Sequence, residues 1–280
     1  MTLGPTESSA LLLSTADGGG SGVAVVIVGG SAGRAGPRLA LTRGPDGAQR
    51  RHGGLGSAAI DERALAVMEE ALADPRARNG LRELETVEGS VELYLEVRRA
   101  VLELVVVGAG HIAQPMAHLG ALLGYRVIVL DDRPAFATRE RFPDAERLVR
   151  ADFSDPFADV PIHDRSHLLL VTRGHKYDYE CLIRALQADP SPAYIGMIGS
   201  RRRVRATYVR LLDEGIDREL LDLIHAPVGL DIGAETPEEI AVAVAAELVM
   251  LDRCGTGASL KDVERVAERF FDQPDGDEAG

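Results

Sequence analysis

The chain has little cysteine. Only Cys181 and Cys254 occur among its 280 residues, and neither stands at a CxxC or Cys/His spacing. This scarcity excludes a disulfide scaffold and a structural zinc site, and it fits a reducing compartment. The sequence also lacks an apolar run of the roughly 18 residues that a membrane helix needs, and it does not start like a signal peptide. We therefore expect a cytoplasmic protein with no membrane partner.

Positive charge is also scarce, since 31 lysines and arginines stand against 44 aspartates and glutamates, for a formal net charge of −13. Repulsion of this sign opposes binding to nucleic-acid phosphates, so we expect no nucleic-acid partner. Hydrophobic residues make up 45% of the chain, which is enough to bury a core. At roughly 150 residues per domain, the length predicts two domains.

The first half of the chain, residues 1–100, is predicted to be a small α+β domain. Residues 1–21 end in a Gly-rich run, a composition typical of a flexible leader. The elements expected after it, from hydrophobic pattern and turn residues, are a buried strand at 23–28, a strand ending at Thr42, a helix at 59–72 and a half-exposed strand at 91–97.

The second half, residues 101–255, alternates strand and helix. Its apolar runs ELVVV, RVIVL, HLLLV and AYIGM are continuous, which is typical of parallel strands buried on both faces. This predicts a Rossmann-like, doubly wound α/β domain. Its last helix should begin at a capping box of Thr236 and Glu239 and run to about Arg253. Residues 256–280 are predicted to form a C-terminal helix and a disordered acidic tail.

A GxGxxA turn follows the first of these runs and opens a helix. Gly108 permits the tight turn, Gly110 lets a pyrophosphate approach the backbone, and Ala113 allows close helix packing. Asp131 ends the next strand, where a carboxylate conventionally binds a ribose diol. We predict that a nucleotide-like ligand binds here; the alternative is a packing turn without a ligand. His111 lies either beside that ligand or against the loop.

Other loops follow predicted strands and so belong to the same edge of the sheet, where ligands of open α/β sheets collect. The loop after HLLLV carries His175 and Lys176, which either bind an acidic or heterocyclic ligand or cap a helix. The Gly-punctuated loop before the capped helix carries Asp231 and Glu235, which either orient a pterin or purine ring or support the loop.

The loop after AYIGM runs from Gly199 into a helix with Ser200 as its N-cap and Arg201 and Arg202 in the first turn. Cations at a helix N-terminus oppose the helix dipole, at about a few tenths of a kcal/mol each. This pattern indicates a bound phosphate or an acidic partner surface, held by charge-assisted hydrogen bonds. The alternative is that these arginines point to solvent or pair with nearby acids.

Together these segments resemble the XdhC/CoxI family of xanthine dehydrogenase accessory factors. Five motifs carry the resemblance: GAGHIAQP at 108–115, LDDRPAFATRERFP at 130–143, TRGHKYD at 172–178, YIGMIGSRRR at 194–203 and PVGLDIGAETPEEIA at 227–241. The resemblance implies a dimeric cytoplasmic chaperone that binds the molybdenum cofactor. It would protect the cofactor while its sulfido ligand is installed and deliver it to a xanthine- or carbon-monoxide-dehydrogenase-type molybdenum hydroxylase apoenzyme.

The same resemblance adds Asp132, Arg133 and Thr172 to the expected cofactor-binding residues, and a cysteine desulfurase to the candidate partners. The N-terminal half matches the family less closely. Ala59 stands where many members have cysteine, and Val87 begins the segment where many have Cys-Gly-Gly. Alanine and valine cannot supply a soft metal ligand or a sulfur acceptor, so we expect no metal ligand and no persulfide relay there.

The leading prediction is a cofactor carrier rather than an enzyme, because no GxSxG, HExxH or Cys/His dyad supplies catalytic residues. An NAD(P)-dependent oxidoreductase is the first alternative, with His175 and Lys176 for proton transfer, and hydride transfer with nicotinamide would identify it. The second is a regulatory module that senses a nucleotide and docks through the GSRRR segment. Nucleotide binding without pterin binding would identify that module.

Overall fold

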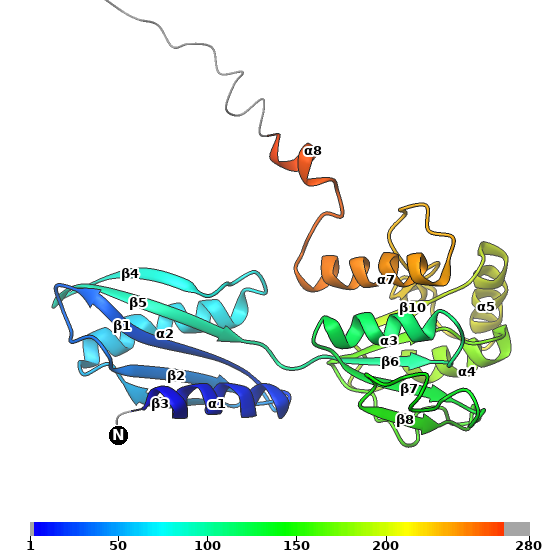
Figure 1. The fold of residues 1–280 in the computed structure, drawn as a ribbon, viewed down its shortest axis with the longest axis horizontal. Coiled ribbons are helices and arrows are strands. Elements are labelled where there is room, and N and C mark those ends of the chain that lie inside the picture. Colours follow the sequence, from blue (N-terminus) through cyan, green and yellow to red (C-terminus); the bar gives the residue numbers. More distant parts are fainter. Residues whose placement is uncertain (1–2, 266–280) are drawn as a thin grey trace, which may run out of the picture.

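The computed structural model describes residues 3–265, which form two β-sheets with helices packed against both (Figure 1). The first sheet is antiparallel, with the strand order β3-β2-β1-β5-β4. Its elements, in chain order, are α1 (Pro5–Asp17), β1 (Ser21–Gly30), β2 (Arg38–Arg43), β3 (Gln49–Gly54), α2 (Ala58–Ala73), β4 (Gly80–Thr86) and β5 (Gly89–Arg98).

The central strand β1 is buried on both faces. Val23 and Val25 pack with Met68 of α2, whereas Ala24 packs with Leu12 of α1 on the other face. Two covering helices explain why the VAVVIV run is continuous rather than alternating. In β5, Val91, Leu93 and Leu95 are buried and Tyr94 is exposed, which confirms the predicted strand with one wet face.

The prediction of a flexible leader at residues 1–21 is wrong, because most of this segment forms α1. The backbone N–H of Gly4 donates to Glu7 at 2.8 Å at the start of the helix, and Leu12 is fully buried against the sheet. A Cβ on Gly22 would lie 2.6 Å from the Leu12 side chain, so glycine allows this close packing. The Gly-rich run therefore ends a helix and admits its contact with β1.

Strands β3 and β4 lie at the two edges of the antiparallel sheet, and the sequence did not predict them. Most side chains of QRRHGG in β3 and GLRELET in β4 are exposed or half-buried. Edge strands of this kind lack the apolar alternation that identifies a strand in a sequence, and their charged side chains discourage pairing with other chains.

The second sheet has the order β11-β10-β9-β6-β7-β8, and all of its strands are parallel. This confirms the predicted Rossmann-like fold, although the short strands β8 and β11 were not predicted. The strands are β6 (Glu103–Val107), β7 (Arg126–Asp131), β8 (Arg147–Arg150), β9 (Ser166–Leu170), β10 (Tyr194–Met197) and β11 (Ile224–His225).

Helices cover both faces of the parallel sheet. The helices α3 (Ala113–Leu122) and α7 (Pro237–Asp252) share one core cluster, and α4 (His175–Leu186), α5 (Arg201–Asp213) and α6 (Arg218–Leu221) share the other. The predicted capping box of α7 is present, since Glu239 N–H donates to Thr236 and Glu239 accepts from Thr236 N–H. None of the helices between residues 3 and 265 is both long and apolar enough to span a bilayer.

The short helix α8 (Leu260–Glu264) follows α7, and the predicted acidic tail lies largely in residues 266–280, outside the described residues. Residues 99–102 join the two sheets. Contacts cross this junction, because the Arg126 guanidinium donates to Asp17 O at 3.5 Å and the Arg76 guanidinium donates to Cys254 O at 3.2 Å. The division into separate domains near residue 100 stays a prediction.

The strand order reverses at β6: β7 and β8 lie on one side of it, and β9, β10 and β11 lie on the other. Such a reversal leaves a crevice outside the carboxyl ends of the strands. We call these strand ends and the loops that follow them the carboxyl edge.

Packing of α1 on the first sheet can be tested with two adjacent leucines. Leu12→Ala should lower the free energy of unfolding by about 2–5 kcal/mol, because a fully buried side chain leaves a cavity. Leu13→Ala, at a residue that is 51% exposed, should change it by less than about 0.5 kcal/mol. Urea denaturation measures both, and equal small effects would contradict a packed α1.

Candidate functional site

The Gly-rich turn after β6 has the form that the fingerprint predicts. Gly108 has φ +107°, and a Cβ there would lie 2.5 Å from Val171 O, so only glycine fits. A Cβ on Gly110 would meet nothing within 4 Å, which leaves its backbone open to a ligand. Ala113 is fully buried at the start of α3, and His111 is exposed. The turn is therefore tightly packed at Gly108 and accessible to a ligand at Gly110.

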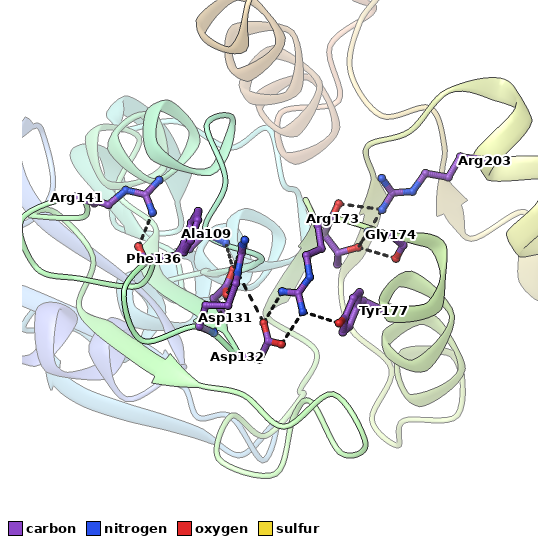
Figure 2. A network of polar contacts seen from close by, with 11 residues as sticks. Ala109, Asp131, Asp132, Phe136, Arg141, Arg173, Gly174, Tyr177 and Arg203 are labelled. Atoms are coloured by element: carbon purple, nitrogen blue, oxygen red, sulfur yellow. Dashed lines mark hydrogen bonds and ion pairs between the residues drawn. The ribbon is translucent and has the colours of Figure 1, made fainter.

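Asp131, the predicted ribose acceptor, lies beneath this turn instead of facing a ligand (Figure 2). Its side chain is 3% exposed, and its oxygens accept from Ala109 N–H at 2.7 Å and from the Arg133 backbone and guanidinium at 2.9 Å. Burial alone would raise the pKa of Asp131, but these hydrogen bonds outweigh it and lower the pKa to about 2. Asp131 and Arg133 are thus supports of the loop.

The next residue, Asp132, is the outward-facing carboxylate, with a side chain that is 30% exposed. It forms a bidentate ion pair with Arg173, at 2.6 and 2.8 Å, and Arg173 also donates to the Tyr177 hydroxyl (Figure 2). The hydrogen bonds to Asp132 raise the pKa of Arg173 further above its usual value. Because β7 and β9 flank β6, this Arg173–Asp132 bridge joins the loops on either side of the Gly-rich turn.

Thr172, another predicted site residue, hydrogen-bonds to neighbouring protein groups. Its hydroxyl donates to Asp178 at 2.6 Å, and the Arg203 guanidinium donates to Asp178 at 2.6 Å and to Thr172 O at 2.9 Å. Asp178 has a fully buried side chain, and this burial raises its pKa although Thr172 and Arg203 oppose the shift. The third arginine of GSRRR therefore turns inward and joins α5 to α4.

The first two arginines of that segment behave differently. Ser200 accepts a hydrogen bond from Arg203 N–H at 3.3 Å and caps α5, as predicted, and Gly199 precedes it. Arg201 and Arg202 are exposed, and within residues 3–265 neither forms an ion pair or side-chain hydrogen bond. They are free to bind an anion at the carboxyl edge.

Four further predicted residues have exposed side chains at this edge. His175 and Lys176 begin α4, directly after the β9 loop, and Asp231 and Glu235 lie between β11 and α7. Gly229 in the latter loop is anchored, since its N–H donates to the buried Glu247 at 2.9 Å. Topology thus brings the predicted loops to one edge, and each offers polar side chains to a ligand.

Sequence reasoning missed the inward-facing network of Asp178 and Arg203 and the bridge that Arg173 forms. The sequence alone does not distinguish the three arginines of the GSRRR segment. Arg203 points toward α4 because of its position around the axis of α5. For Asp178 there was a signal: a carboxylate in the first turn of a helix directly after a buried strand.

The cysteines and the positions of the expected thiols lie away from this edge. Cys181 is buried in α4, where burial raises its thiol pKa, and exposed Cys254 follows the opposite end of α7. Ala59 lies in α2, and Val87 lies in the turn between β4 and β5. Close to them in sequence, the side chains of Ser57 and Glu88 hydrogen-bond each other. Between residues 3 and 265 there is no cluster of three His, Cys, Asp or Glu side chains that could hold a metal ion.

A parallel sheet that reverses its strand order at a Gly-rich turn defines a Rossmann-type domain. The family model described as the XdhC Rossmann domain matches residues 104–248. The chain belongs to the XdhC family, which confirms the resemblance that its motifs predicted.

The chain is similar to two curated proteins. It is 30% identical over 213 residues to the uncharacterized protein YqeB of Escherichia coli K12, a match that covers 73% of this chain and 38% of the relative. It is 36% identical over 146 residues to a Bacillus subtilis 168 protein described as a probable subunit of xanthine dehydrogenase, covering 52% and 42%. Each match thus spans about two fifths of the relative's length.

A crystal structure of a Bacillus halodurans protein described as a xanthine dehydrogenase has a similar fold. The two structures superpose with a TM-score of 0.52 at 20% sequence identity, over 91% of this chain and 99% of that one. At this identity the likeness establishes the fold and no more.

The inward-facing role of Arg203 predicts a contrast between neighbouring arginines. Arg203→Met should destabilise the protein by about 3 kcal/mol, because it leaves the buried Asp178 without its cationic partner. Arg202→Met, at an exposed residue, should change stability by less than about 0.5 kcal/mol. Thermal or urea unfolding measures both, and an Arg203→Met variant as stable as Arg202→Met would contradict the assignment.

The lowered pKa of Asp131 predicts a pH-dependent contribution to stability. Its ionised form stabilises the fold above its unfolded pKa, near 4, and this contribution disappears as the pH falls toward about 2. Asp131→Asn should therefore cost on the order of 2 kcal/mol at pH 7, with a difference from wild type that shrinks below about pH 4. Denaturation at several pH values measures this, with exposed Asp213→Asn as the control; a difference that stays constant would refute it.

Proposed function

We propose that this protein carries the molybdenum cofactor, binds it as cargo at the carboxyl edge and delivers it to a molybdenum hydroxylase of the xanthine dehydrogenase type. The observation that carries the proposal is that exposed nitrogen-bearing side chains and an open Gly-rich turn lie together at one edge. Arg201, Arg202, His175 and Lys176 are all exposed there, and Gly110 leaves its backbone accessible. An anionic ligand fits this arrangement.

The chemistry of the cofactor matches these residues. Its phosphate ester is an anion that Arg201 and Arg202 can bind by charge-assisted hydrogen bonds. Its pterin ring carries N–H donors for carboxylates, and Asp231 and Glu235 have exposed side chains with no hydrogen bond within residues 3–265. The residues at this edge would therefore hold the organic part of the cofactor, which suits a carrier that has to release its cargo.

The cysteine content also suits a carrier of this kind. Buried Cys181 and the distant Cys254 offer no thiolate at the carboxyl edge, and Ala59 and Val87 offer none in the first sheet's layer. If a cysteine desulfurase takes part, it would have to deliver sulfur to the cofactor without a thiol of these two positions.

The proposed recipient is supported by the name of the Bacillus subtilis relative, which describes a probable part of a xanthine dehydrogenase. We also propose a homodimer. An apolar groove of about 510 Å³ lies between α3 and α7, and Leu122, Val242 and Val249 on these helices are 73%, 49% and 40% exposed. A second copy packed on this face would remove these side chains from water.

The NAD(P)-dependent oxidoreductase is the weaker alternative. The oxygens of Asp131 are held by protein donors, so this residue has no free acceptor for the ribose diol. The Arg173–Asp132 bridge also joins the loops on either side of β6, across the strand end that an extended dinucleotide would follow.

The carrier role predicts cofactor retention that depends on the exposed arginines. The purified protein, incubated anaerobically with molybdenum cofactor and gel-filtered, should retain near-stoichiometric pterin, detected by fluorescence after oxidation. The Arg201→Ala/Arg202→Ala double variant should retain at least about tenfold less, since two charge-assisted contacts are lost. Arg63→Ala, at an exposed arginine of α2, should behave like wild type. Wild-type retention no higher than that of an unrelated protein would exclude the carrier role.

A further inference from the structure

A cavity of about 1040 Å³ lies where the two sheets join, at the edge of the parallel sheet opposite to the carboxyl edge. It is lined by the turn after α2, the end of β5, residues 99–102, the turn before β7 and the end of α7, which faces the first sheet (Figure 1). We propose that this cavity, the junction cleft, binds a small phosphate monoester with an apolar body, held between Arg78 and Arg253.

These two arginines come from opposite sides of the junction cleft. Arg78 follows α2, and Arg253 is the C-cap of α7. Both are exposed, and among residues 3–265 neither forms an ion pair or a side-chain hydrogen bond. The hydrogen bond from the Arg76 guanidinium to Cys254 O, at 3.2 Å, brings their two segments together. One ligand can therefore contact both guanidinium groups.

The junction cleft is positively charged in an acidic protein. Among residues 3–265, four arginines and one carboxylate line it, although the formal net charge of the chain is −13. Arg99 is fixed at the cleft, since its guanidinium donates to the carbonyls of Ala71, Leu72 and Asp74 at 2.9, 3.0 and 2.5 Å. Burial lowers the pKa of Arg99, and repulsion from Arg253 adds to the shift although Asp74 opposes it. A bound anion would relieve this repulsion.

The carboxylate in the lining, Asp252, is held by other residues. It accepts a hydrogen bond from the Tyr125 hydroxyl on one oxygen and from His167 Nε2, at 3.3 Å, on the other, and both partners are buried. Burial would raise the pKa of Asp252, but the hydrogen bonds from His167 and Tyr125 outweigh it and lower the pKa. Asp252 forms no ion pair with Arg253 in this structure, so the guanidinium stays available to a ligand.

Apolar side chains supply the rest of the recognition. Leu72 is buried, Val97 and Leu102 are half-buried and Leu123 is 43% exposed, and all four line the cleft. An inorganic ion would leave these side chains in water, whereas an organic group attached to the phosphate would cover them. A phosphate monoester carries about two negative charges at neutral pH, which matches two free guanidinium groups. The cavity is also large enough for a small molecule, which needs roughly 300–1000 Å³.

Phenyl phosphate is a probe that combines both parts, and calorimetric titration measures its binding. The full-length protein should carry Arg201→Ala and Arg202→Ala, so that the carboxyl edge does not compete for the anion. This parent should bind phenyl phosphate at least about tenfold more tightly than inorganic phosphate, because the ring covers apolar side chains. Adding Arg78→Gln and Arg253→Gln should weaken phenyl phosphate binding at least about tenfold.

The matched control adds Arg34→Gln and Arg63→Gln, which make the same change in net charge at two exposed arginines outside the cleft. It should bind phenyl phosphate like the parent, and both sets of variants should unfold at the parent's temperature. Absence of phenyl phosphate binding, equal affinity for phenyl phosphate and inorganic phosphate, or equal losses in the two sets would each overturn the proposal.

Amide hydrogen exchange locates the bound ligand. Saturation of the parent with phenyl phosphate should slow exchange at residues 74–79 and 252–255, which contribute the two arginines from the two sides of the cleft. Slowing confined to residues 108–112 or 199–203 would place the ligand at the carboxyl edge instead and would overturn the proposal.

The junction cleft goes beyond the carrier role, and the pterin-retention assay separates the two. Arg78→Gln/Arg253→Gln, in the otherwise wild-type protein, should retain pterin like wild type. Loss of pterin from this variant would mean that the cleft holds the cargo's own phosphate ester, which would overturn a separate site. A wild-type protein that retains no pterin would exclude the carrier role and leave the phenyl phosphate result unchanged.

Discussion

Asp131 accepts hydrogen bonds from two loops at once, and the geometry of the carboxyl edge depends on this buried carboxylate. It holds the Gly-rich turn through Ala109 N–H at 2.7 Å and the following loop through three donors of Arg133 at 2.9 Å. The Arg133 guanidinium lies 3.7 Å from the centroid of the Phe136 ring, which extends the support outward. The loops after β6 and β7 therefore share one anchor, which fixes their spacing in this structure.

A second anchor on the other side of β6 works in the same way. Asp178, Thr172 and Arg203 tie the loop after β9 to the starts of α4 and α5. Both anchors use buried carboxylates whose partners are protein donors, so their charges are compensated internally. The charged side chains left facing outward include the cations Arg201, Arg202 and Lys176 and the carboxylates Asp132, Asp231 and Glu235, in a protein with a formal net charge of −13. The edge thus offers cations for an anionic group in an otherwise acidic protein.

The sequence predicted the parallel sheet and the antiparallel strands that lie at the centre of their sheet, because buried apolar runs and capping residues depend only on neighbours along the chain. The capping box at Thr236 was predicted residue by residue and is present. The helix α1 was missed because its Gly-rich end resembles a linker, while its main stabilising contact, Leu12 against Ala24 and Ala40, joins distant parts of the chain. The edge strands were missed because their side chains are largely exposed.

The candidate site shows the same division more sharply. The sequence by itself determined which loops form the carboxyl edge, because the carboxyl ends of parallel strands lie at one edge whatever the strand order. It also determined that Gly108 is the glycine of a tight turn, and the structure gives this residue a positive φ. Only the tertiary structure decided which of two adjacent aspartates is buried and which of three consecutive arginines turns inward. Successive side chains of a strand point to opposite faces, and those of a helix point about 100° apart, so neighbours with equal sequence signals meet different surroundings. Those surroundings are set by segments that lie far away along the chain.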